Sequence, residues 1–183
     1  MQTIDLQETG LRTLNATLHA QAEQTNQTVW EIENPRGAHA LACGLDAPIE
    51  VIVNGSTGYY CAGMNKQATV HIKGSAGPGV AENMMSGTVV IDGDASQYAG
   101  ATGHGGLLVI KGNASSRCGI SMTGIDIVVF GNVGHQLFSR IYMDFLRMEG
   151  EASFLLLLPA ATLVLSFLTS NPQRKLEPRQ DTE

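Results

Sequence analysis

Short apolar segments recur through the middle of the chain with a constant 19-residue period. In each segment the first and third residues are apolar, and alternate residues of a β-strand face the same side. We therefore expect short strands with two inward-facing columns, made of Val51, Val70, Val89, Leu108, Ile127 and Leu146, and of Val53, Ile72, Ile91, Ile110, Val129 and Met148. The residues between them are mixed in character, which predicts an outward column of Ile52, His71, Val90, Val109, Val128 and Arg147.

A glycine follows every one of these segments in the same register. This main glycine column consists of Gly55, Gly74, Gly93, Gly112, Gly131 and Gly150. A variable residue precedes each glycine, which favours a corner with positive φ at the glycine itself. Seven residues after each position of the main column stands a second column of small residues, namely Cys43, Ala62, Ala81, Gly100 and Gly119. Small side chains repeated in this way indicate an inward turn or a close approach of two backbones.

The period predicts the fold class. A fixed repeat near twenty residues is typical of stacked-repeat proteins. A repeat of this length is too short for a strand, a helix and two loops, but it suffices for two or three short strands joined by tight corners, which make one coil of a β-helix. Crossovers between parallel strands are right-handed in nearly all proteins. We therefore predict an all-β, right-handed parallel β-helix built from 19-residue coils.

The flanking segments divide the chain into an N-terminal helix and linker (1–28), the β-helix (29–153) and a divergent C-terminal segment (154–183). Leu11, Leu14 and Leu18 have the spacing of an apolar helix stripe that could cap one end of the stack, with Thr9 as a possible N-cap. A strand at 29–32 begins a first coil of irregular length. The apolar run 154–168 could be a degenerate last coil or capping helix, a membrane anchor, or foreign sequence after a loss of reading frame near residue 136. The tail 171–183 is expected to be disordered.

Composition supports an uncharged stack. Charged residues make up 15% of the 183 residues and glycine accounts for 21 of them, against averages of roughly 25% and 7%. The net charge of −6 argues against a nucleic-acid surface, and the absence of a signal peptide predicts a cytoplasmic protein. Cys61 and Cys118 would lie three coils apart, beyond disulfide reach, so that reduced core thiols are expected.

Several features suggest chemistry but have simpler interpretations. The segments 74–79 and 103–106 resemble phosphate-binding loops, yet no Lys-Ser/Thr pair follows and the 19-residue period already explains most of their glycines. The histidines His39, His71, His104 and His135 belong to different columns and cannot converge on one metal ion. No nucleophile set or carboxylate pair stands out. We expect no catalytic, cofactor or metal site in this chain.

Five segments of the repeat region carry a family resemblance. They are 58–67 (GYYCAGMNKQ), 80–87 (VAENMMSG), 99–110 (AGATGHGGLLVI), 117–122 (RCGISM) and 124–127 (GIDI). Together they resemble the GXGXG β-helix domain at the C-terminus of the glutamate synthase large subunit, and especially the stand-alone version of this domain in N-methylglutamate synthase-like complexes. Formylmethanofuran dehydrogenase contains a more distant relative as one of its subunits. The resemblance covers roughly residues 28–135 and ends at Gln136.

The resemblance implies a non-catalytic scaffold. Its structural glycine motif would be Gly55, Gly74, Gly93, Gly100, Gly112, Gly119, Gly131 and Gly150. The implied partners are a class II glutamine amidotransferase subunit and an FMN-dependent glutamate synthase-like subunit, with FMN and an iron–sulfur cluster on a partner and no cofactor on this chain. Neither nucleic-acid binding nor membrane association is expected. The alternatives are a free-standing assembly or binding module, whose contact surface could include Lys73, Asp92 and Lys111, and a polysaccharide-acting β-helix enzyme, which one Trp and scattered acids disfavour.

Overall fold

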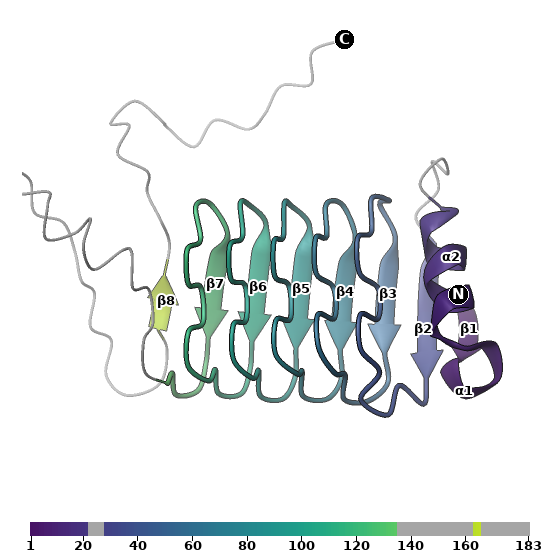
Figure 1. Cartoon of the computed structure of the whole chain (residues 1–183), viewed down its shortest axis with the longest axis horizontal. Helices are drawn as coiled ribbons and strands as arrows, with labels where there is room; N and C mark the ends of the chain where they lie inside the picture. The colour runs from purple at the N-terminus through teal and green to yellow at the C-terminus, as the bar shows by residue number, and fades with distance from the viewer. Residues whose placement is uncertain (22–27, 135–162, 166–183) are drawn as a thin grey trace, which may run out of the picture.

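The computed structural model describes residues 1–21, 28–134 and 163–165. Its elements, in chain order, are β1 (Gln2–Asp5), α1 (Leu6–Thr9), α2 (Leu11–His19), β2 (Val29–Glu33), β3 (Glu50–Val53), β4 (Thr69–Ile72), β5 (Thr88–Ile91), β6 (Leu107–Ile110), β7 (Asp126–Val129) and β8 (Leu163–Leu165). The strands form one eight-stranded sheet in sequence order. The pairs from β1 to β7 are parallel, and β8 pairs antiparallel with β7. Figure 1 shows the strands side by side along the long axis of the molecule.

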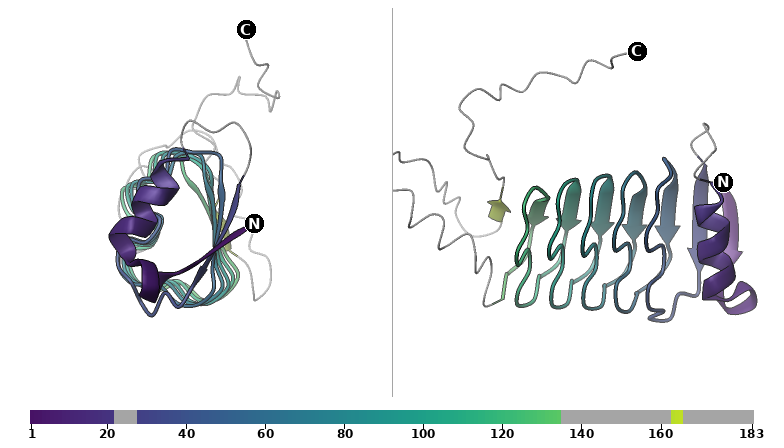
Figure 2. Two further views of the ribbon diagram at one scale, coloured as in Figure 1. Left: turned by 90° about the vertical axis from the view of Figure 1, so that its right-hand side faces the viewer. Right: turned by 45° about the horizontal axis from the view of Figure 1, so that its top comes forward.

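From β3 to β7 the chain forms a regular solenoid. Each strand pairs with the next at the same sequence offset, so that Val51 pairs with Val70 and Val70 with Val89. The other side of each coil adds one further parallel contact, through single-residue bridges at Thr57, Ala76, Ala95, Ala114 and Val133. Seen from the N-terminal end, each coil runs down the strand side and up the opposite side as it recedes, which is a right-handed path (Figure 2). The predicted parallel β-helix is confirmed, with one strand and one bridge per coil.

The two inward columns form the core, as predicted. Every described member is 2% exposed or less, from Val51 and Val53 in β3 to Ile127 and Val129 in β7. The intervening outward residues, such as His71 and Val90, are half-buried. Alternation along each four-residue strand thus seals one side against the interior and leaves the other on the surface of the sheet.

The first coil is longer than the others, also as predicted. Val29 of β2 pairs with Glu50 of β3, whereas Glu50 pairs with Thr69 of β4, so that the first offset exceeds the later ones by two positions. Trp30 and Ile32 of β2 point into the core, and both are buried.

The N-terminal segment differs from the sequence prediction in two ways. Residues 2–5 form strand β1, which extends the sheet by pairing with β2. The helix is interrupted at Gly10, which has φ 76° and is the N-cap of α2; Thr9 is instead the last residue of α1. Thr9 is therefore not the cap, because the chain turns sharply after it. The Asp5 side chain accepts a hydrogen bond of 2.9 Å from the Gln7 N–H and caps α1.

The helix α2 covers the N-terminal end of the stack (Figure 2). Leu14 and Leu18 are fully buried against the core, and Leu11 is partly buried. Asn15 pairs with the edge of the first coil in both senses: its Nδ2 donates to Ala40 O at 2.9 Å, and its Oδ1 accepts from Ala42 N at 3.0 Å. An open solenoid edge exposes unpaired backbone groups, and α2 satisfies two of them with one side chain.

Several sequence predictions lie outside the described residues. These are the columns at Leu146, Arg147, Met148 and Gly150, most of the apolar run 154–168, and the tail. Within the described part of the chain, no helix is both long and apolar enough to cross a membrane. The division into 1–28, 29–153 and 154–183 stays a prediction.

Candidate functional site

The main glycine column lies where successive coils approach most closely. The prediction of positive φ at these corners is wrong for Gly74, Gly93, Gly112 and Gly131, and holds only for Gly55, at φ 144°. The requirement for glycine is steric instead. A Cβ on Gly74 would lie 2.7 Å from both Gly55 C and Ser56 N of the preceding coil. Backbone hydrogen bonds of 3.0 Å join the column, from Gly93 N to Gly74 O and from Gly112 N to Gly93 O.

A ladder of polar side chains runs beside this column, which the sequence analysis missed. It consists of the residues that follow the glycines, Ser56, Ser75, Asp94, Asn113 and Asn132. In each step the side-chain oxygen accepts a hydrogen bond from the backbone N–H of the equivalent residue in the next coil, at 2.7–3.1 Å. The signal was present as a fixed column of short polar residues. These groups hold coils in register and are therefore occupied by structural bonds.

Positive φ occurs in the small-residue column instead. Ala62, Ala81, Gly100 and Gly119 have φ between 53° and 66° and are fully or almost fully buried. Their counterpart in the first coil is Ala42, at φ 54°, and not Cys43 as the constant spacing predicted. The reason is the longer first coil: Ala62 N donates to Leu41 O just as Ala81 N donates to Cys61 O.

The left-handed conformation alternates along this side of each coil, which we call the turn side. In the coil that contains Ala62, Tyr60 (φ 57°) and Met64 (φ 55°) are also left-handed. The next coil has Gly79 (φ 72°) and Asn83 (φ 56°) at the same two positions. Non-glycine residues rarely adopt this conformation, and asparagine is among those that tolerate it best.

The strand side carries a charged cluster. The Asp92 carboxylate accepts from His71 Nε2 at 2.8 Å and forms an ion pair with Lys111 Nζ at 2.7 Å. The hydrogen bonds from His71 and Lys111 lower the pKa of Asp92 to about 2. All three side chains come from successive coils, so that the cluster cross-links the stack. It includes Asp92 and Lys111 of the contact surface that the sequence suggested for a binding module.

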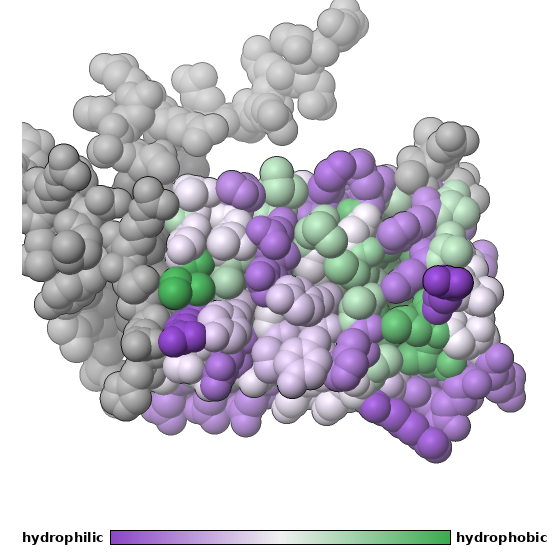
Figure 3. Space-filling model, in the orientation of Figure 1, coloured by the Kyte–Doolittle hydropathy of each residue, from purple (hydrophilic) through white to green (hydrophobic). Residues whose placement is uncertain are grey.

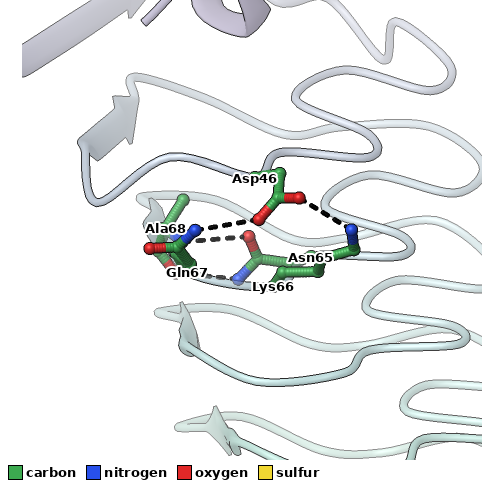
Figure 4. A network of polar contacts seen from close by, with 5 residues as sticks. All are labelled: Asp46, Asn65, Lys66, Gln67 and Ala68. Carbon is green, nitrogen blue, oxygen red and sulfur yellow. Dashed lines mark hydrogen bonds and ion pairs between the residues drawn. The ribbon is translucent and has the colours of Figure 1, made fainter. Parts of the chain in front are cut away.

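A second polar network fixes the corner between the turn side and the next strand (Figure 4). The exposed Asp46 carboxylate accepts from Lys66 Nζ at 2.7 Å and from Gln67 Nε2 at 2.9 Å. Beneath it the buried Asn65 donates to Ala68 O at 2.7 Å and accepts from Ala68 N at 3.2 Å. The hydrogen bond from Lys66 is the largest of the effects that lower the pKa of Asp46. The arrangement closes a turn and leaves no group aimed at a ligand.

The cysteines are free thiols, as predicted. Cys61 and Cys118 are buried, and burial raises the pKa of each to about 12. Cys43 is half-buried, and burial raises its pKa as well. A thiol with a raised pKa is a poor nucleophile. The described residues contain no group of three or more His, Cys, Asp or Glu side chains that could hold a metal ion.

The turn side presents aromatic and methionine side chains. Tyr59, Tyr60, Met64 and Met85 are each about half exposed, between 47% and 52%. The His39 ring packs against Tyr59 at a centroid distance of 4.7 Å, and its Nδ1 accepts from Tyr59 N at 2.9 Å. We call Tyr59, Tyr60, Met64 and Met85 the turn-side patch. On the face shown in Figure 3, strongly hydrophobic colouring is confined to small spots among hydrophilic and intermediate residues.

The fold and these surfaces define a β-helix whose described polar groups serve mainly to join coils. Among curated proteins, the chain is similar to "Protein GlxC" of Rhizobium meliloti (strain 1021), at 68% identity over 70 residues. That match spans 38% of this chain and 31% of the relative, so that the similarity concerns less than a third of that protein. The family model of fatty acid cis/trans isomerase matches residues 124–166, most of which lie outside the described residues. No solved structure matches the chain.

Proposed function

We propose that this chain is a non-catalytic scaffold subunit of a glutamate synthase-like complex, of the N-methylglutamate-forming kind. In this complex it holds a class II glutamine amidotransferase subunit beside an FMN-dependent synthase subunit. The observation that carries the proposal is the coincidence of motif and coil. The segments 58–67, 80–87, 99–110 and 117–122, which resemble the GXGXG domain, fall on the turn sides of four successive coils of a continuous β-helix.

The interior of the stack supports a scaffolding role. The strand residues that face inward are 2% exposed or less in every coil from β3 to β7, so that the interior is filled by side chains. The polar ladder, the Asp46 corner and the Asp92 cluster are occupied by bonds between coils. The surface of such a rigid rod is suited to holding other proteins at fixed positions.

The donor set agrees with cofactors that reside on partners. An iron–sulfur cluster is usually held by four thiolates, and the chain has three cysteines, of which Cys61 and Cys118 are buried with strongly raised pKa values. We therefore assign FMN and the iron–sulfur cluster to the synthase partner. The isomerase family model does not change the proposal, because it covers less than a quarter of the chain and only one of the regular strands, β7.

The proposal is tested by co-expressing the tagged chain with the amidotransferase and flavoprotein subunits encoded beside its gene. We expect all three chains to co-purify, with FMN present and glutamine hydrolysed by the assembly. The isolated chain should neither quench FMN fluorescence nor hydrolyse glutamine. Absence of such neighbouring genes, or activity of the isolated chain, would refute the proposed role.

A further inference from the structure

The turn-side patch combines exposed apolar side chains with a backbone that disfavours them. Tyr60 and Met64 are about half exposed and have left-handed φ values of 57° and 55°. The next coil places Gly79 and Asn83 at the equivalent positions, and these residue types suit the conformation. Tyrosine and methionine therefore stand where glycine and asparagine would fold more easily. Positions at which a sequence departs from its local structural preference are expected to be functional sites.

The patch is continuous across three coils. Tyr59 and Tyr60 are adjacent in one coil, and His39 of the preceding coil packs on Tyr59. The Tyr60 ring lies over Gly79 of the following coil, since a Cβ on that glycine would lie 3.2 Å from two ring atoms. Met64 N and Met85 N both donate to neighbouring coils, to Glu82 O and Asn65 O respectively. Tyrosine and methionine are enriched at the centres of protein interfaces, where charged residues are depleted.

One carboxylate lies within this apolar surface. Glu82 Oε2 would be 2.7 Å from a Cβ on Gly79, so that it flanks the same glycine as the Tyr60 ring. Glu82 is half-buried, and within the described residues no ion pair or side-chain hydrogen bond reaches its carboxylate. Partial burial raises the pKa of Glu82. A carboxylate in this position is stabilised when a cation from outside covers it.

The cations on the described turn side are already engaged. Lys66, at the edge of the patch, is paired with Asp46 at 2.7 Å. The Arg117 guanidinium lies over the Tyr98 ring at 5.4 Å from its centroid. A second copy of this turn side would bring the same engaged cations, so that the charge pattern favours a different protein.

We propose that the turn-side patch, together with Glu82, is the docking surface for a partner protein that presents an apolar surface with one Lys or Arg facing Glu82. This inference rests on the proposed scaffolding function, and it assigns the partner to the turn side and not to the strand side. The strained positions contribute to binding at the expense of folding stability.

The test uses the full chain and its two proposed partner subunits, each titrated separately. The double variant Tyr60→Gly/Met64→Asn places favourable residues at the left-handed positions, so that its urea midpoint should equal or exceed that of the wild type. Its affinity for one partner should nevertheless fall tenfold or more. Glu82→Lys should weaken the same complex by a similar factor. The matched control is Phe130→Ser, an equally exposed aromatic at 49% beyond strand β7, which should change the affinity less than twofold.

Each other outcome is decisive. If the wild type binds a partner and the double variant binds equally well, the patch is not the docking surface, although the scaffolding function stands. If the folded wild type binds neither partner, both proposals fail. If light scattering shows a dimer of the isolated chain that Tyr60→Gly/Met64→Asn converts to a monomer, a second copy occupies the patch and the assignment to a different protein is wrong.

Discussion

Replacing Gly74 by alanine tests why the main column consists of glycine. The added methyl group would lie 2.6 Å from Ser56 Oγ and 2.7 Å from the Gly55 carbonyl carbon, whereas favourable contacts between carbon atoms lie at about 3.5–4.0 Å. Both contacts belong to the preceding coil and most of the contacting atoms are backbone. The coils must therefore separate locally, which also stretches the 3.1 Å hydrogen bond from Ser75 N to Ser56 Oγ.

The expected loss of stability follows from three effects. Overpacking of this kind costs about 1–3 kcal/mol, and the weakened hydrogen bond adds about 1 kcal/mol. The smaller conformational freedom of alanine in the unfolded chain offsets about 0.5–1 kcal/mol. We expect Gly74→Ala to lower the free energy of unfolding by about 2 kcal/mol, as a net of these contributions. Urea unfolding followed by far-ultraviolet circular dichroism would measure it.

Two further variants separate steric contact from backbone conformation. Gly63→Ala is the matched control, because its Cβ would meet its nearest neighbour, Tyr60 O, at 3.3 Å and the next coils carry Glu82 and Ala101 at this position; it should cost less than about 0.5 kcal/mol, as surface-type changes do. Gly74→Asn would be tolerated if a positive φ were the reason for glycine, but should be at least as damaging as alanine if space is the reason. A Gly74→Ala protein as stable as Gly63→Ala would refute the close-approach account.

The remaining predictions concern the cap, the charged cluster and the thiols. Asn15→Ala leaves two backbone groups of the first coil unpaired and should cost about 2–3 kcal/mol in urea unfolding, whereas Arg12→Ala on the exposed face of α2 should be nearly neutral. Asp92 has its pKa lowered from 3.8 to about 2, so that its stabilising contribution is present above pH 4 and is lost as the pH falls through 2; the difference in urea midpoint between wild type and Asp92→Asn should shrink over that window. Cys61 and Cys118 have their pKa raised from 9.0 to about 12, so that their contribution to stability is present below pH 9 and is lost as the pH rises through 12. Ellman's reagent at pH 8 should modify Cys43 before either, and these two only after unfolding; rapid native labelling of Cys118 would contradict the described burial.

The sequence predicted the lattice but not the reason for each of its positions. The inward columns, the outward column and the irregular first coil follow from alternation and period, and all are confirmed in the described residues. The role of the main glycine column was misassigned, because a periodic glycine shows that a side chain is excluded and does not reveal whether φ or space excludes it. Only the coordinates show that Gly74 meets the backbone of the preceding coil.

Features that depend on tertiary contacts were not predictable in this way. The segment 2–5 contains one strongly apolar residue, Ile4, and becomes strand β1 because β2 offers a free edge. The left-handed φ at Tyr60 and Met64 contradicts the local preference of both residues and is imposed by the stacking of the turn side. The two-way hydrogen bonding of Asn15 needs the helix to be docked on the first coil. These are the positions where long-range structure overrides local preference.

The central claim is that this β-helix acts as a scaffold for two catalytic subunits. Sedimentation velocity of the purified chain mixed with equimolar amidotransferase and flavoprotein subunits tests it most directly. The account predicts one boundary that sediments faster than any single chain, absorbs at the flavin wavelength and contains all three proteins. A flavin boundary unchanged by adding this chain, with the chain sedimenting alone, would contradict it.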